Sequence, residues 1–285
     1  MNELELPKPE YPKAPIRRTK FLKRRMISSD DHHFVGRVFE LGIVGLSFDT
    51  YEQLSKFPDV KYAIDVERSV SSLTQRVESL NLVGDLLWPE PFPADFSKLP
   101  FHQYQWLGIS TDVFLVRYTS VVDCALLLVN EVLQLGLSAR KCTLDTMARK
   151  GMPRDLKHQF EQMIDEQHSI RMERNARVHH GKERTFTWDD LTFRMASTWG
   201  HRGSGLKGTD AYGREIDLDL SFKEGLVGLQ FEFNRQTRKL EKRLDVFYSL
   251  LWPEFEDRFR PLIAAATHGL NANARQRGIL KGGLT

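Results

Sequence analysis

The feature that most constrains the fold of this sequence is a long apolar stripe in its last quarter. Steps of three and four residues place side chains on one face of an α-helix, whereas a half-buried β-strand requires strict alternation. A capping-box pattern at Ser221–Glu224 opens the predicted helix, and Pro253 is expected to end it. A last helix is predicted over about 255–267. The stripe consists of Leu226, Leu229, Phe233, Leu240, Leu244, Phe247 and Leu251.

Further segments carry the same helical period. Residues 112–135 are apolar over much of a helix circumference, which is typical of a central bundle helix, and Gly136 suits the position after its end. A short helix is predicted over 143–150 and a longer one over 154–180, ended by Gly181. Thr187–Asp190 has the form of another capping box. Together these segments predict an all-α helical bundle over residues 106–270.

The chain outside this bundle divides into three parts. Residues 1–29 form a basic, proline-rich arm, and residues 271–285 a flexible basic tail. Residues 30–105 give mixed signals, with a short helix predicted to start at Asp49 or Thr50, another over 66–83, and a break at 88–93. This middle part is either an N-terminal helical subdomain or an extension of the bundle.

Composition restricts the possible classes of protein. The 285 residues are 41% apolar and 28% charged, as in an ordinary globular protein, and the net charge is only +3. Any affinity for nucleic acid must therefore come from local basic patches. Two cysteines, no apolar membrane span and no signal-peptide core together favour a cytoplasmic protein without a membrane partner. Nucleotide-binding P-loop, esterase-elbow and zincin motifs are absent from the sequence.

The predicted helix over 154–180 changes character along one face. Its stripe begins with apolar residues and continues as Gln167, Arg171 and Arg174. The adjoining stripe ends in Asn175 and His179. A solvated helix end would more simply turn its charges away from the core side. The polar half therefore predicts a functional site or an interface.

Arg174, Asn175 and His179 resemble the R-x4–6-H motif of the HEPN superfamily, in which a polar residue commonly follows the arginine. HEPN proteins are all-α domains that dimerise, and many are metal-independent endoribonucleases. They occur as toxins of toxin–antitoxin pairs, in anti-phage systems and in RNA-guided CRISPR effectors. The resemblance implies an RNA substrate, a homodimer, no cofactor, and an antitoxin or defence-system partner. Looser matches at Arg25…His32 and Arg194…His201 lack the following asparagine.

These residue types suit RNA cleavage without a metal. Histidine transfers protons near neutral pH because its unperturbed pKa is about 6.5. Arginine stays charged and matches phosphate oxygens, and asparagine can orient either partner without titrating. Arg174 and His179 are five residues apart, so they diverge by about 140° on a regular helix. Two copies facing each other across a twofold axis would bring the two groups together.

Other residues are predicted to assist. His180 either shares the catalytic role or caps the last helical turn, and Arg171 and Arg177 either hold phosphates or form salt bridges. The basic arm and a glycine-rich loop over 200–213 are predicted to contact RNA phosphates. Their candidate RNA-binding residues are Arg17, Arg18, Arg24, Arg25, Arg202 and Lys207.

Two alternatives remain open at the level of sequence. The polar cluster could pin helix packing in a non-catalytic helical protein that binds nucleic acid or acts as a scaffold. The run Asp30, Asp31, His32 and His33 could instead ligate a metal in a hydrolase, although no partner ligands follow at a supporting spacing.

Overall fold

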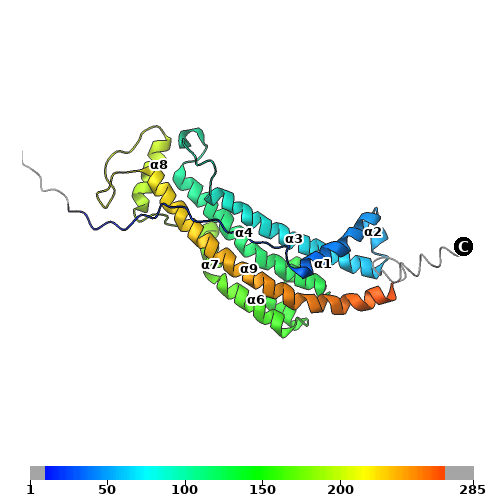
Figure 1. Cartoon of the computed structure of the whole chain (residues 1–285). Coiled ribbons are helices and arrows are strands. Elements are labelled where there is room, and N and C mark those ends of the chain that lie inside the picture. The colour runs from blue at the N-terminus through cyan, green and yellow to red at the C-terminus, as the bar shows by residue number, and fades with distance from the viewer. Residues whose placement is uncertain (1–9, 267–285) are drawn as a thin grey trace, which may run out of the picture. The chain divides into compact units, whose positions relative to one another are not determined.

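The structure is a computed structural model that describes residues 10–266, and these residues form helices and loops (Figure 1). Among them, the β-structure is limited to an isolated bridge between Thr209 and Glu215, so the all-α prediction is confirmed. The tail predicted over 271–285 lies outside the described residues. The helices are α1 (His33–Gly42), η1 (Ile43–Ser47), α2 (Tyr51–Leu54), α3 (Pro58–Leu87), η2 (Phe96–Lys98), α4 (Gln103–Val132), η3 (Ala139–Lys141), α5 (Leu144–Arg149), α6 (Arg154–Glu166), α7 (His168–His180), α8 (Asp190–His201) and α9 (Leu218–Ala265).

The described chain divides into two compact units. The first unit comprises residues 10–24, 82–114 and 175–235, and the second comprises 25–81, 115–174 and 236–266. The division falls inside the long helices α3, α4 and α9 and inside α7. No helix among the described residues combines the length and the apolar character needed to cross a bilayer.

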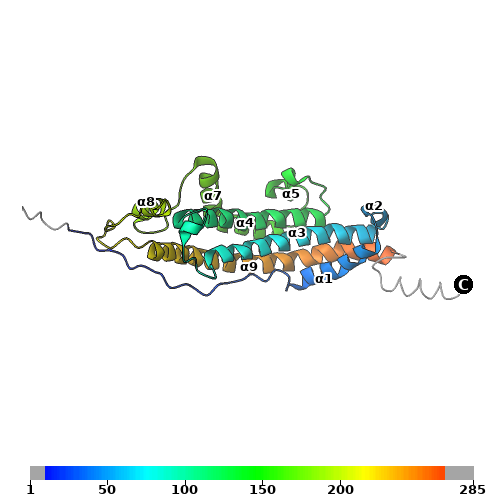
Figure 2. The ribbon, with the colours of Figure 1, turned by 90° about the horizontal axis from the view of Figure 1, so that it is seen from above.

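Aromatic side chains hold the second unit together. Tyr62 of α3 stacks on Phe255 of α9 with 5.5 Å between ring centroids, and its hydroxyl donates to the Val132 carbonyl of α4 at 2.8 Å. Phe160 of α6 meets Phe247 of α9 edge to face at 5.4 Å. Figure 2 shows α1 beside the C-terminal part of α9. The buried apolar faces of these helices meet in one core.

The first unit has its own aromatic core. Phe222 of α9 is fully buried and meets Phe96 at 5.0 Å and Trp106 of α4 at 6.0 Å, edge to face in both cases. Farther along the same helices, Phe114 of α4 lies 5.7 Å from Phe233 of α9. The seven residues of the predicted apolar stripe are all buried, which confirms the helix period.

The end predicted for the longest helix was wrong. Helix α9 continues through Pro253 and Pro261 to Ala265 instead of ending at Pro253. An internal proline costs about 3 kcal/mol. Continuing the helix keeps Phe255 and Phe259 on the face of Leu251, and both rings are almost fully buried. Burial of two such side chains contributes roughly 3–6 kcal/mol, which offsets a cost of this size at Pro253.

Some predicted helix starts also differ. Helix α9 begins at Leu218, so Ser221 is not its cap, and the Asp217 carboxylate accepts the Leu220 amide at 2.9 Å. The Thr187–Asp190 capping box does not form, because Asp190 instead accepts the Phe186 amide at 2.6 Å. Helix α4 starts at Gln103 rather than near 112 and ends at Val132. Helices α2 and α5 begin within a residue or two of their predicted starts, and Thr50 and Thr143 are their N-caps.

Candidate active site

The motif lies on α7, as the sequence predicts, but the expected helix over 154–180 is interrupted at Gln167. This side chain is buried, donates to the Tyr118 carbonyl at 3.0 Å and accepts from Arg171 at 3.1 Å. The chain stays close to helical there, since the Arg171 amide still donates to the Gln167 carbonyl at 2.8 Å. Gly181 has a φ of 60°, which is the expected conformation just after a helix end.

Arg171 and Arg174 point from α7 toward α4 within the second unit. Arg171 Nη2 lies 2.8 Å from Asp123 Oδ1 and donates to the Thr119 carbonyl at 3.2 Å. Arg174 Nη1 donates to Thr119 Oγ1 at 3.0 Å. Thr119 is fully buried, and its hydroxyl proton goes to the Leu115 carbonyl at 2.9 Å. The direction of the Arg174 side chain is thus set by a buried acceptor.

Asn175 and His179 lie on an adjoining face of α7. Both residues are exposed, as is His180. They are four residues apart on a regular helix and therefore share one face, whereas Arg174 turns away from His179 by about 140°. Val178, which is 61% exposed, borders this face. A single copy of α7 does not aim the arginine and the histidine at one point.

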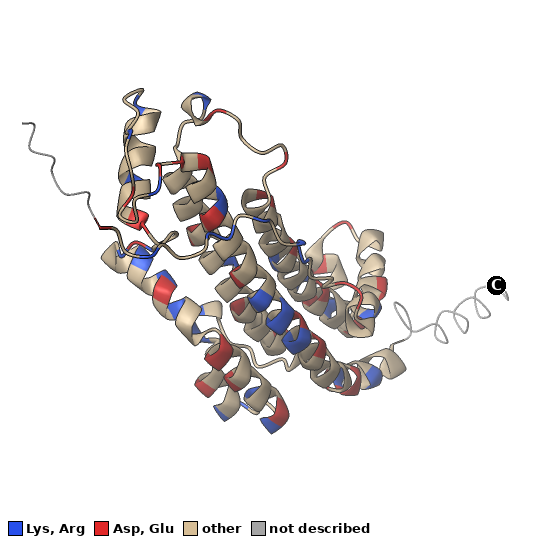
Figure 3. Ribbon diagram, turned by 60° about the vertical axis from the view of Figure 1, so that its left-hand side comes forward, with Lys and Arg blue, Asp and Glu red and all other residues tan. Residues whose placement is uncertain are grey.

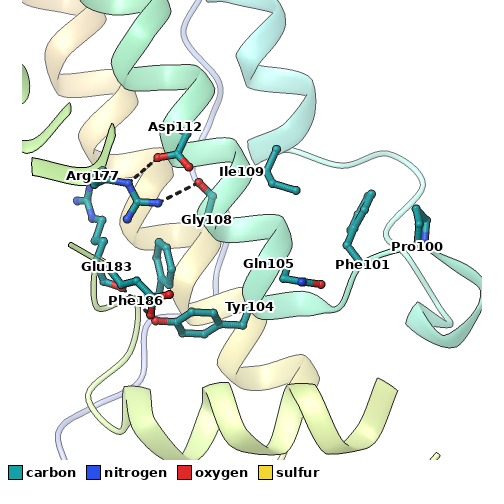
Figure 4. Close-up of a pocket in the computed structure, with 11 residues that line it drawn as sticks. Pro100, Phe101, Tyr104, Gln105, Gly108, Ile109, Asp112, Arg177, Glu183 and Phe186 are labelled. Carbon is teal, nitrogen blue, oxygen red and sulfur yellow. Dashed lines mark hydrogen bonds and ion pairs between the residues drawn. The ribbon is translucent and has the colours of Figure 1, made fainter. Parts of the chain in front are cut away.

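Arg177 makes its contacts with other residues of the first unit. Its side chain is only 11% exposed, and its Nε donates to Asp112 Oδ1 of α4 at 2.5 Å. Its Nη2 donates to the Gly108 carbonyl at 3.4 Å (Figure 4). Of the two roles predicted for Arg177, the salt bridge is the one that the structure contains.

An open cleft of about 460 Å³ lies beside Arg177 in the first unit. Figure 4 shows Arg177 and Glu183 on one side of it and Pro100 and Phe101 on the other. Tyr104 forms its floor, with its hydroxyl donating to Asp190 Oδ2 at 2.8 Å. Burial raises the pKa of Tyr104, and the hydrogen bond to Asp190 raises it further, so this phenol stays protonated. Sequence reasoning missed this cleft.

The basic arm is bound to the first unit through arginines that the sequence assigned to RNA. Arg17 Nη2 lies 3.4 Å from Asp210 Oδ2, and Arg24 pairs with Asp85. For Asp210, burial opposes ionisation, but hydrogen bonds from the backbone and side chain of Arg214 outweigh it and lower its pKa.

The remaining candidate RNA-binding residues differ in their surroundings. Arg25 pairs with Glu241 in the second unit. Arg18 is exposed, and so are Arg202 and Lys207 in the loop after α8. Basic and acidic residues alternate along the helices, as Figure 3 shows, which agrees with the small net charge. Of the six candidate RNA-binding residues, Arg18, Arg202 and Lys207 are the three that are exposed.

The run from Asp30 to His33 serves the helix α1. His32 is its N-cap, with Nδ1 accepting the Phe34 amide at 3.1 Å and Nε2 lying 3.2 Å from Ser249 Oγ. Within residues 10–266, no group of three or more histidine, cysteine, aspartate or glutamate residues is arranged to hold a metal ion. The structure thus gives the metal alternative no set of ligands among these residues.

A second histidine has the same role in the first unit. His102 directly precedes α4, and its Nδ1 accepts the Gln105 amide at 3.4 Å. Gln105 Oε1 in turn accepts the His102 amide at 3.2 Å, which completes a reciprocal cap. Burial lowers the pKa of His102, and the nearby His201 and Arg194 lower it further. The spacing of histidine and glutamine three residues apart could have revealed this cap.

The helical architecture and the polar residues of α7 define an all-α domain of HEPN type. A family model described as Cthe2314-like HEPN matches residues 62–244, which is more than half of the chain. The chain therefore belongs to this HEPN family. The matched region includes helices α4 to α8, most of α3 and the first part of α9. No curated protein and no solved structure matches the chain.

Proposed function

We propose that this chain is a metal-independent endoribonuclease of HEPN type that acts as a homodimer. Membership of the HEPN family supports an RNA-related role. The observation that carries the proposal is the arrangement of α7, which exposes Asn175 and His179 on one face and turns Arg174 to the adjoining side. A polar face of this kind beside an ordered arginine suits phosphoryl transfer.

The three residues have distinct roles in the proposed reaction. The 2′-oxygen of RNA attacks the adjacent phosphorus, the bond from phosphorus to the 5′-oxygen breaks, and a 2′,3′-cyclic phosphate and a 5′-hydroxyl form. His179 takes the proton of the 2′-hydroxyl or returns one to the 5′-oxygen. Arg174 stabilises the charge on the phosphorane-like transition state. Asn175, four residues before His179, orients the imidazole or the phosphate.

The angle between Arg174 and His179 makes a second copy necessary. A twofold contact repeats each residue on both sides, so Arg174 of one copy can face His179 of the other across a shared phosphate. Apolar Val178 and Met172 of α7, 61% and 58% exposed, would be covered in such a contact. A monomer lacks the complete pocket.

The other candidate residues have supporting roles in this scheme. His180 adjoins His179, and Arg171 and Arg177 hold α7 against α4 through Asp123 and Asp112. The exposed Arg18, Arg202 and Lys207 contact phosphates outside the cleavage site. A ribonuclease of this kind would arrest growth as a toxin or an anti-phage effector, and an antitoxin or another defence-system protein would restrain it.

Cleavage of RNA in the presence of a chelator tests the proposal. The purified chain should cut RNA in EDTA, and a substrate with 2′-deoxyribose at the cut should resist. Arg174→Ala should lower the rate about 10²–10³-fold by removing charge stabilisation. His179→Ala should lower it about 10²–10⁴-fold by removing proton transfer. The cleaved ends are identified by their cyclic phosphate in mass spectra.

Matched controls separate chemistry from folding. His158→Ala removes an exposed histidine of α6, and Arg149→Ala removes an exposed arginine of α5, and both variants should cut RNA like the wild type. Intact RNA after incubation with the wild type, or undiminished cutting by both Arg174→Ala and His179→Ala, contradicts the proposal. Toxicity on expression that disappears with His179→Ala would support the growth-arrest role.

A second candidate function is a non-catalytic helical RNA-binding or scaffold protein. It is favoured by the internal partners of Arg171, Arg174 and Arg177, since a cluster that pins α7 to α4 needs no substrate. This function predicts salt-sensitive RNA binding that survives His179→Ala and falls when Arg18 and Lys207 are replaced by alanine. The ribonuclease instead predicts loss of cleavage with binding retained.

A further inference from the structure

The cleft beside Arg177 adjoins the end of the motif helix. Arg177 belongs to the last turn of α7, two residues before His179, and Glu183 and Phe186 belong to the segment that follows α7. Asn175, His179 and one wall of the cleft thus belong to one short stretch of the first unit, and the other wall belongs to α4 and the residues before it. Arg177 and His179 diverge by about 160° on a regular helix, so a strand cut at His179 would reach the cleft by passing around the C-terminal end of α7.

The lining of the cleft suits a flat, neutral aromatic group. Phe101 and Phe186 are half-buried, and Ile109 is 49% exposed on α4 (Figure 4). Ring faces and an aliphatic side chain are surfaces on which nucleobases stack. A volume of about 460 Å³ lies within the range of sites for small organic ligands.

The charges around the cleft favour the binding of a neutral base over the binding of a phosphate. Arg177 is paired with Asp112, and Arg184 with Glu232. Glu183 is paired with Arg194. Positive charge is therefore neutralised locally, and the carboxylates of Asp112 and Glu183 would repel a phosphate. Both carboxylates are about half exposed and can accept hydrogen bonds from N–H groups.

We propose that this cleft binds a nucleobase of single-stranded RNA, with guanine preferred. Guanine carries adjacent N1–H and N2–H donors that match a carboxylate, together with acceptors that suit a guanidinium. Uracil has no exocyclic amino group and offers fewer donors. The inference rests on the proposed ribonuclease function, and within it the cleft selects RNA in which a guanine lies within a few nucleotides of the cleaved bond.

Gly108 lines the cleft, so a larger side chain introduced at this position can be used to fill it. A Cβ built on Gly108 of α4 would meet only Arg177 Nη2, at 3.9 Å, so Gly108→Leu should place its side chain in the cleft without a clash. Gly228→Leu is the matched control, because Gly228 is exposed on α9 with nothing within 4 Å of an added Cβ. Ile109→Ala is a second variant that removes an exposed side chain and leaves the helix intact.

Binding is measured first with free nucleotides. Guanosine 5′-monophosphate should shift the methyl signals of Ile109 in NMR spectra of the wild type, and uridine 5′-monophosphate should bind several-fold more weakly. Gly108→Leu should weaken binding at least about tenfold and Ile109→Ala less, with Gly228→Leu equal to the wild type. No shift at Ile109, equal binding of both nucleotides, or unchanged binding by Gly108→Leu overturns the inference.

The second measurement distinguishes a free nucleotide from a base in RNA. Wild-type cut sites should be enriched in a guanine at a fixed position within a few nucleotides of the cut, and the cuts made by Gly108→Leu should lack that enrichment. Guanosine monophosphate binding without any guanine preference at the cut sites overturns the assignment to RNA. The two proposals can fail separately, because His179→Ala should abolish cleavage and still bind a guanine-containing oligonucleotide better than an oligouridine. Equal affinity of His179→Ala for the two oligonucleotides overturns the inference even where cleavage is found.

Discussion

Thr119 determines where Arg174 points. Its buried hydroxyl donates its one proton to the Leu115 carbonyl and accepts a hydrogen bond from Arg174 Nη1 at 3.0 Å. Thr119 lies 55 residues before Arg174, so local sequence patterns do not predict this pairing. In the proposed reaction, Thr119 is a positioning residue because it acts through the arginine.

Thr119→Val should separate positioning from folding. Valine keeps the shape of threonine but cannot accept the hydrogen bond, and a hydrogen bond to a charged group contributes about 1.5–3 kcal/mol. We expect kcat for RNA cleavage to fall roughly tenfold or more, with KM nearly unchanged. Thr119→Ser should restore most of the rate. A Thr119→Val rate equal to that of the wild type, at equal helix content by circular dichroism, would contradict this role.

At the scale of single elements, two helices begin at a histidine. His32 caps α1 and His102 caps α4, each through an unprotonated Nδ1 that accepts a backbone amide. Burial lowers the pKa of His32, with His33 adding to the shift and Asp245 opposing it. Burial likewise lowers the pKa of His102. Protonation of Nδ1 removes the acceptor, so each cap exists only in the neutral form.

Because the pKa values of His32 and His102 are lowered in the folded chain, the free energy of unfolding falls on acidification. In the unfolded chain these histidines titrate near pH 6.5, and in the folded chain at lower pH. Between the two values the unfolded state binds more protons, so stability falls as pH drops below about 6.5. Replacing both with asparagine keeps a capping side chain that does not titrate. The double variant should lose less Tm between pH 7.5 and 5.5 than the wild type.

The control for this measurement is His158→Asn. His158 is exposed on α6 and caps no helix start, so its replacement should leave the pH dependence of Tm unchanged. The same pH dependence in the double variant and the wild type would show that the caps are not the source of acid sensitivity.

For the whole molecule, the proposed site depends on two copies. Arg174→Ala and His179→Ala, each inactive alone, should regain activity when they are mixed and allowed to exchange subunits. Random exchange makes half of the dimers mixed. Each mixed dimer has two sites, and in one of them both Arg174 and His179 are intact. The mixture should therefore reach about a quarter of wild-type activity. Light scattering on the same sample should give the mass of a dimer. A monomer at all working concentrations, or no recovery on mixing, would contradict the composite site.

The local pattern of residue types was sufficient to predict the helical class of this protein and many of its helices. Apolar residues at steps of three and four predicted the all-α class and the buried stripe of α9, because helical periodicity depends only on neighbours along the chain. The same local rules placed Arg174, Asn175 and His179 on one helix and ended it at Gly181. They also predicted where two short helices begin, close to Thr50 and Thr143.

Only the tertiary structure decided the features that depend on contacts between distant segments of the chain. Helix α9 passes Pro253 because distant aromatic residues bury Phe255 and Phe259 against it. Arg17 meets a carboxylate 193 residues away, and Arg25 meets one 216 residues away. The cleft beside Arg177 likewise joins α4 to the segment after α7. A sequence specifies which groups are charged or apolar, but which of them meet depends on packing between segments far apart in the chain.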